Sequence, residues 1–212
     1  MLTSRPRPNT DAGTKVIIDM SLPPLLLGCG IFAKEIGHLI AKNGWEVETV
    51  FLDSALHNYL QRLEKGLTGS LAKRHGRDIV VFYGCCHPLI DRWISSAGAT
   101  RVVGQNCVEI LLGKERFDRE LENGAFFLLE EWALRWDRIT RELYGANPEV
   151  IREIFRGELS RMLAIRTPCS ANFSALAEAA AEKVGLPLEW TDVGLEHLEQ
   201  VLETALRNKL HE

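Results

Sequence analysis

The sequence lacks any long apolar segment and has no excess of positive charge. No apolar run among its 212 residues approaches the roughly 18 that a membrane-crossing helix needs. The 25 lysines and arginines are outnumbered by 29 aspartates and glutamates, so the formal net charge is −4 and no basic surface for nucleic acid is expected. Residues 1–14 have no apolar core, so we expect a flexible lead-in and not a secretory signal. We therefore expect a soluble protein of the cytoplasm with no membrane partner.

Several catalytic signatures are also missing. The sequence contains no Ser-His-Asp order, no HExxH, no Walker loop and no DxHxxG corrinoid signature. It has five cysteines, an odd number, and without a signal for secretion a framework of disulfides is not expected. The question is therefore whether these thiols fill the core or bind a ligand.

Apolar runs typical of buried strands alternate with amphipathic helical stretches. The pattern predicts strands at residues 15–18, 25–27, 45–52, 79–83, 100–103, 124–129, 162–167 and 188–193. It predicts helices at residues 31–42, 59–74, 88–94, 110–123, 130–143, 148–156, 172–183 and 195–210. Such alternation is typical of an α/β fold with a mainly parallel sheet and right-handed crossovers. We predict a Rossmann-like three-layer sandwich, with residues 15–212 forming a single α/β domain.

The stretch at residues 79–88 concentrates the chemically interesting side chains. Four apolar residues and Tyr83 run into Gly84-Cys85-Cys86-His87-Pro88. A continuous apolar run predicts a strand buried on both faces, so it should be central in the sheet. The thiols then lie just past the carboxyl end of a strand, where open α/β sheets bind ligands.

All five cysteines follow predicted strands in the same way. Cys29, Cys107 and Cys169 come at or after the ends of three other strands. If one parallel sheet contains all these strands, their carboxyl ends share one edge, and thiols distant in sequence come together. Cysteine as a small buried apolar residue near loops remains the alternative interpretation.

Thiolates with an imidazole are ligands for Zn²⁺ or an iron–sulfur cluster. We predict a metal site formed by Cys29, Cys86 and Cys107, with His87 as a fourth candidate, because three protein ligands leave a position open for a substrate. Glu109 or His87 would move a proton.

Two neighbouring positions complete this hypothesis. Adjacent residues rarely face the same ion, so Cys85 is expected to point elsewhere. Arg166, near the carboxyl end of the predicted strand at 162–167, is expected to bind an anionic group of a small-molecule substrate.

A second interpretation concerns the first strand and helix. Gly28-x-Gly30-x-x-Ala33 approximates the GxGxxG/A loop of dinucleotide-binding proteins, and Asp53 lies at about the distance expected for the ribose-binding acid. Gly28 and Gly30 would then bind the phosphates of a nucleotide.

With these motifs in view, the chain resembles the family described as domain of unknown function 1638, over about residues 25–195. The resemblance is carried by Cys29-Gly30-Ile31-Phe32, Tyr83-Gly84-Cys85-Cys86-His87-Pro88, residues 104–113 and residues 124–129. The family pattern Gly-x-Cys-His-Pro maps its cysteine onto Cys86. The resemblance implies an association with corrinoid-dependent methyltransferase systems, and hence with methylamine or one-carbon metabolism.

Three hypotheses follow. The first is a metal-dependent enzyme of group-transfer or lyase chemistry. The second is a non-catalytic accessory module for a corrinoid protein or methyltransferase. The third is a nucleotide binder. The sequence leaves homo-oligomerisation open.

Overall fold

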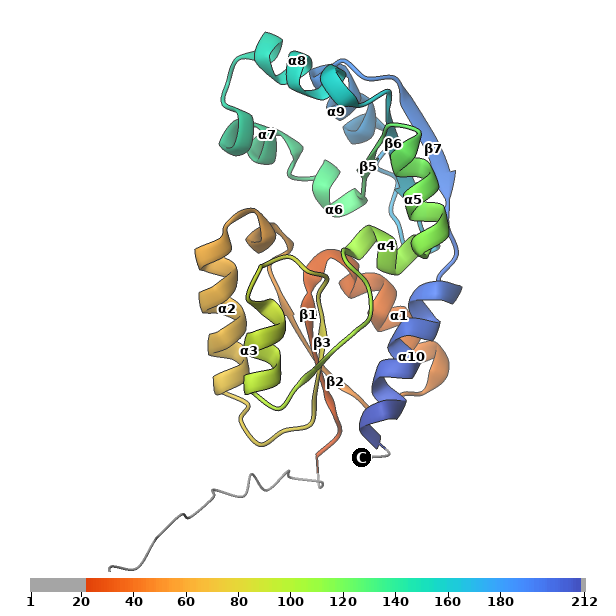
Figure 1. Ribbon diagram of the computed structural model, residues 1–212. Helices are drawn as coiled ribbons and strands as arrows, with labels where there is room; N and C mark the ends of the chain where they lie inside the picture. The colour runs from red at the N-terminus through yellow and green to blue at the C-terminus, as the bar shows by residue number, and fades with distance from the viewer. Residues whose placement is uncertain (1–21, 211–212) are drawn as a thin grey trace, which may run out of the picture.

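The computed structural model describes residues 22–210, so the predicted lead-in and the predicted strand at 15–18 lie outside the described residues. The fold is α/β and Rossmann-like, as predicted, and every strand pair is parallel. The strands form two sheets, and Figure 1 shows them in two lobes, one above the other.

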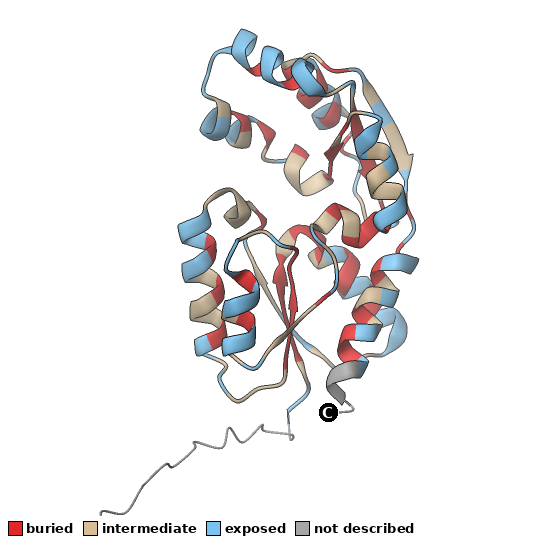
Figure 2. Cartoon of the chain, viewed as in Figure 1, coloured by how far each residue is buried: buried red, intermediate tan, exposed pale blue. Residues whose placement is uncertain are grey.

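The first lobe is built on a four-stranded sheet in the order β2-β1-β3-β4. Its strands are β1 (Leu25–Cys29), β2 (Glu48–Leu52), β3 (Ile79–Phe82) and β4 (Thr100–Arg101). The helical segments that accompany them are η1 (Gly30–Phe32), α1 (Ala33–Asn43), η2 (Ser54–Asn58), α2 (Leu60–Ala72) and α3 (Ile90–Ser96). All four side chains of β3 are buried, and the strand pairs with both β1 and β4, so the prediction of a central strand is confirmed. Figure 2 shows this buried centre between exposed outer helix faces.

The second lobe is built on a three-stranded sheet in the order β5-β6-β7. Its strands are β5 (Ala125–Leu128), β6 (Arg161–Arg166) and β7 (Leu188–Asp192). Its helices are α6 (Glu130–Ala133), α7 (Trp136–Tyr144), α8 (Pro148–Glu158) and α9 (Ser174–Val184). The chain enters this lobe through α4 (Cys107–Leu112) and α5 (Lys114–Glu122) and returns to the first lobe as α10 (Glu196–Leu210).

The expectation that one sheet edge holds all five cysteines was wrong. Cys169 follows β6, which belongs to the second sheet. The reason is physical: β4 has only two residues, and two successive helices carry the chain away before β5 begins. A local apolar pattern identifies a strand. The sheet that the strand joins depends on contacts with distant segments, which no local pattern contains.

Side chains along β6 point alternately to the two faces of the second sheet, and one of these faces packs against the first lobe. Met162 and Ala164 pack with α8 and α9 in a core confined to the second lobe. Leu163 and Ile165 point to the opposite face and belong to the core that also contains β1, β3 and α10. The second sheet therefore has two buried faces, and one of them is continuous with the core of the first lobe. Within residues 22–210 no helix is both long and apolar enough to cross a membrane.

Candidate functional site

A cavity of about 430 Å³ lies between the two lobes and is lined by residues of both. One wall is formed by the carboxyl ends of β1 and β3, by η2 and by the start of α4. The opposite wall is formed by α5, β5, α6 and α7. Figure 1 shows α6 and α7 above the ends of β1 and β3. A cavity of this size is typical of small-molecule sites. We name it the interlobe cavity.

The three cysteines predicted as ligands, Cys29, Cys86 and Cys107, all line the interlobe cavity. Cys29 is the last residue of β1, Cys86 follows β3, and Cys107 begins α4. Three segments distant in sequence thus present thiols to one space.

Close backbone contact fixes two of these segments against each other. The Cys85 amide donates to the Gln105 carbonyl at 2.6 Å. A Cβ atom at Gly84 would lie 2.4 Å from the Gln105 carbonyl oxygen and 2.5 Å from the Asn106 Cα atom. Only glycine allows this approach, so Gly84 positions the Cys86 loop beside the start of α4.

The thiols are protonated in this arrangement. Burial raises the pKa of Cys29 to about 12, and the neighbouring Cys86 contributes to the rise. Burial also raises the pKa of Cys107, with further contributions from Cys29 and Cys86. Burial again is the main cause of the raised pKa of Cys86. These three groups therefore lie within electrostatic range of one another, and as neutral thiols they are poor nucleophiles.

His57 is a titratable residue of the interlobe cavity that the metal hypothesis did not include. Its Nδ1 lies 2.6 Å from the Ser54 carbonyl oxygen, so Nδ1 carries the proton and donates. Nε2 makes no hydrogen bond with any residue in the part of the chain that the structure describes. The lone pair of Nε2 is therefore available for a proton or a metal ion. The sequence feature that could have identified His57 is its position shortly after the end of a predicted strand.

The three predicted catalytic residues do not line the interlobe cavity. The His87 ring lies 4.2 Å from the Trp93 ring, and its Nδ1 accepts from the Leu89 amide. Glu109 accepts a long hydrogen bond from the amide of Gln105.

Arg166 is exposed on the second lobe, where its guanidinium pairs with Asp192 and lies over the Trp190 ring. It is the last residue of β6, which belongs to the other sheet, so the predicted grouping with the thiols does not occur.

Cys85 and Cys169 also lie outside the cavity lining. Cys85 is exposed, and its sulfur lies 3.5 Å from the Arg101 guanidinium, so this thiol points elsewhere, as the spacing predicted. Cys169 is half-buried, and its amide donates to the Thr167 hydroxyl.

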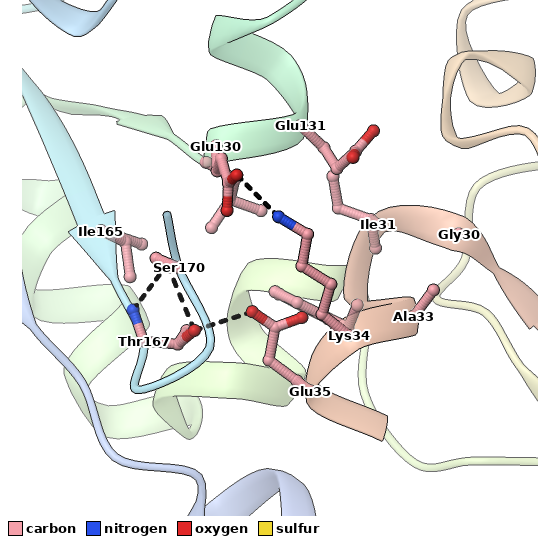
Figure 3. Close-up of a pocket in the computed structure, with 12 residues that line it drawn as sticks. Gly30, Ile31, Ala33, Lys34, Glu35, Glu130, Glu131, Ile165, Thr167 and Ser170 are labelled. Carbon is pink, nitrogen blue, oxygen red and sulfur yellow. Dashed lines mark hydrogen bonds and ion pairs between the residues drawn. The ribbon is translucent and has the colours of Figure 1, made fainter. Parts of the chain in front are cut away.

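The two glycines predicted to bind phosphates have separate positions. Gly28 lies inside β1, where a Cβ atom would approach the Cβ of Phe82 to 3.0 Å, so close strand packing explains this glycine. Gly30 lines a second, smaller cavity of about 50 Å³, drawn in Figure 3. Glu35, Glu130 and Glu131 line the same cavity, and its one lysine, Lys34, already pairs with Glu130. The excess of carboxylates does not favour a phosphate there.

The wall of the second lobe was not recognised from the sequence. It carries Phe117, Phe126, Phe127, Trp132, Trp136 and Tyr144. Their spacing predicted only an amphipathic helix and a strand. Helices and strands that pack into a closed core show the same spacing. This aromatic face lines a cavity because the first lobe lies on the other side of it.

The fold and the site define an α/β protein with two parallel sheets and a thiol-lined cavity between them. The chain belongs to the family described as protein of unknown function (DUF1638), whose model matches residues 51–202. No curated protein and no solved structure shows significant similarity to it.

Proposed function

We propose that the chain is a metal-dependent enzyme whose reaction takes place in the interlobe cavity. Cys29, Cys86 and Cys107 would hold Zn²⁺ or an iron–sulfur cluster, and the reaction would be a group transfer or an elimination of the lyase type. The observation that carries the proposal is the convergence of these three cysteines, from three segments, on one cavity. Sulfur donors suit both kinds of metal centre.

The proposal requires a rearrangement when metal binds. Among residues 22–210 no group of three histidine, cysteine, aspartate or glutamate side chains is arranged to hold a metal ion. Zinc–sulfur bonds are about 2.3 Å long, so the thiols must draw together and lose their protons. The movement has to come from the three segments that carry the thiols, since all three belong to one wall of the cavity.

Proton transfer in this proposal is assigned to His57 because it lines the cavity, whereas His87 and Glu109 do not. The anionic substrate expected from Arg166 is not carried into the proposal, since no arginine in the part of the chain that the structure describes lines the cavity.

Metal analysis of protein purified without oxygen tests the proposal. We expect roughly one zinc per chain, or iron with a brown colour for a cluster. Cys29→Ser, Cys86→Ser and Cys107→Ser should each lower the metal content, while Cys169→Ser, outside the cavity lining, should not. A metal-free wild type whose stability is unchanged by added zinc or iron contradicts the proposal.

A second candidate is an accessory module for a corrinoid methyltransferase system in methylamine or one-carbon metabolism. The observation that favours it is the position of His87, Glu109 and Arg166 outside the cavity, which leaves few acid–base groups there. Copurification with a corrinoid protein, without turnover by the isolated chain, would support this candidate.

A further inference from the structure

We infer that the interlobe cavity binds an uncharged aromatic or conjugated molecule that carries hydrogen-bond acceptors. The inference names a ligand class for the cavity in which the proposed function locates the reaction, and it rests on that proposal only for this location. Three features of the lining carry it.

The first feature is the aromatic wall of the second lobe. Phe117 and Phe127 stack with ring centroids 5.3 Å apart. Phe126 and Trp136 meet edge to face at 5.4 Å. Rings held in this way present flat, weakly hydrated faces, and a planar ligand gains both burial and ring–ring contacts from them.

The wall also reaches across to the first lobe. The Trp132 ring on α6 lies 5.9 Å from the His57 ring of η2. Both lobes therefore supply rings to the cavity lining, and a flat molecule can lie against them with more contact than a globular one.

The second feature is the absence of formal charge. None of the residues within 22–210 that line the interlobe cavity is Asp, Glu, Lys or Arg. An ionised ligand would lose its hydration there without a partner of opposite charge, which is costly. The polar groups that are present include the His57 ring and the uncharged amides of Asn58 and Asn106. The lining therefore selects against small anions and favours neutral molecules.

The third feature is a set of buried donors without acceptors. The Tyr83 hydroxyl and the indole nitrogens of Trp132 and Trp136 have no hydrogen-bond partner among the described residues. All three side chains line the cavity, and Tyr83 is only 2% exposed. Buried donors are normally paired, so unpaired donors around one cavity indicate a partner that binds there. A bound molecule with acceptor atoms would supply it.

A matched set of naphthalene derivatives tests the inference with the protein as purified. Naphthalene-2-carboxamide is neutral and has an acceptor, 2-naphthoate is an anion of the same shape, and naphthalene has no acceptor. Titration calorimetry should give the tightest binding for the carboxamide. We expect 2-naphthoate to bind at least about tenfold more weakly, because its charge has no partner.

Substitutions separate the roles of ring and donor. Trp132→Phe keeps an aromatic ring and removes the indole donor. It should weaken carboxamide binding about fivefold and leave naphthalene binding unchanged. Trp190→Phe is the matched control, since Trp190 packs against Phe173 outside the cavity and neither affinity should change.

Other outcomes overturn the inference. It fails if 2-naphthoate binds as tightly as the carboxamide, if Trp132→Phe has no effect on either ligand, or if neither ligand binds to protein that unfolds cooperatively. The same titration on the Cys29→Ser, Cys86→Ser, Cys107→Ser triple variant separates the inference from the metal proposal. Carboxamide binding by that variant and by a metal-free wild type would retain the ligand class and remove the metal. A wild type that contains metal but shows no preference for the neutral ligand would retain the metal proposal and remove the ligand class.

Discussion

Gly84 is the residue on which the approach of two thiols depends. Its backbone lies so close to Gln105 and Asn106 that no side chain fits at this position. Arg101 reinforces the same contact, because its guanidinium donates to the carbonyls of Tyr83 and Gly104 on both sides of it. The position of Cys86 relative to Cys107 therefore follows from a missing Cβ atom and from one half-buried guanidinium.

Gly84→Ala should destabilise the protein and separate the two loops. The added methyl group meets backbone atoms, which cannot rotate away, so we expect a loss of about 1–3 kcal/mol in the free energy of unfolding. Urea denaturation measures this loss. Gly37→Ala is the control, because Gly37 is exposed in α1 and nothing lies within 4 Å of its would-be Cβ. That variant should be neutral or more stable, by up to about 1 kcal/mol. Equal stabilities for the two variants would show that the close contact at Gly84 is not rigid.

At the scale of elements, α1 of the first lobe is joined to the second lobe through polar contacts. The Thr167 hydroxyl, just after β6, donates to the Glu35 carboxylate on α1 at 2.7 Å, and Glu35 is only 6% exposed. Lys34, one residue earlier, pairs with Glu130 on α6 at 2.7 Å. Figure 3 shows both contacts beside the smaller cavity. They hold the α1 end of the first lobe against the second sheet.

Thr167→Val tests the buried contact. The valine has nearly the same shape but cannot donate, so Glu35 is left buried without this partner. We expect a loss of about 1–3 kcal/mol of unfolding free energy. Thr167→Ser keeps the hydroxyl and should lose much less. If valine and serine prove equally stable in urea denaturation, the hydrogen bond contributes nothing.

A second contact between elements borders the interlobe cavity. Asp53, which caps η2, pairs with Arg135 between α6 and α7. These two segments carry His57 and Trp132, both of which line the cavity. The pair is largely exposed, so it contributes less than about 1 kcal/mol to stability, and its effect is on the approach of the two walls.

Asp53→Asn should make the interlobe cavity more accessible without unfolding the protein. Asparagine can still cap η2, so only the charge pair is lost. In a Cys85→Ser background we expect iodoacetamide to modify Cys86 several-fold faster, as followed by mass spectrometry. Cys169, outside the cavity, is the internal control and should react at an unchanged rate. Unchanged modification of Cys86 would mean that the pair does not restrict access.

At the scale of the whole molecule, the two sheets share a core. The inner face of the second sheet packs with β1, β3 and α10, and Leu198 and Leu202 of α10 are fully buried. Lys42 and Asn43 of α1 bind Glu199 and fix α10 against the first lobe. The chain thus passes to the second lobe through α4 and returns through α10, and residues of both helices belong to the shared core.

Surface carboxylates determine the expected response of the whole molecule to acid. A hydrogen bond from the Ala55 amide lowers the pKa of Asp53, and Arg135 adds to the effect. Lys183 lowers the pKa of Asp137, and Lys42 lowers the pKa of Glu199. A carboxyl group whose pKa is lowered by folding stabilises the folded state above its unfolded pKa, and that contribution is lost as the pH falls through the folded value.

The urea midpoint should therefore stay nearly constant between pH 7 and about pH 5 and fall below about pH 4.5. In Glu199→Gln the fall should be smaller, because that variant has one carboxyl group fewer to protonate. These groups are exposed, so salt screens their charges. At 0.5 M salt the screening length is about 5 Å, and the dependence of the urea midpoint on pH should become smaller. An identical acid response in the variant and the wild type would assign the response to other carboxyl groups.

Local pattern predicted the elements of this protein well. Apolar runs and helical periodicity identified the strands of both sheets and most helices, because side-chain burial follows a period of two or of about 3.6 residues. The apolar run at residues 79–83 predicted the central position of β3, and that position in turn predicted that Cys29, Cys86 and Cys107 would lie at one edge of the sheet. All three line the interlobe cavity. The metal site expected from them stays a prediction. These inferences needed only the rule that parallel strands end on a common edge.

Tertiary structure alone decided which elements face each other. No periodicity distinguishes a strand that joins the first sheet from one that starts a second, so Cys169 and Arg166 were expected at the wrong edge. Nor does a helix pattern tell whether an aromatic face meets a core or a cavity, which is why the wall containing Trp132 and Trp136 was missed. The sequence by itself determined what each segment buries, since burial is a property of local pattern; the fold decided what covers it, since pairing between distant segments depends on the shape of the whole chain.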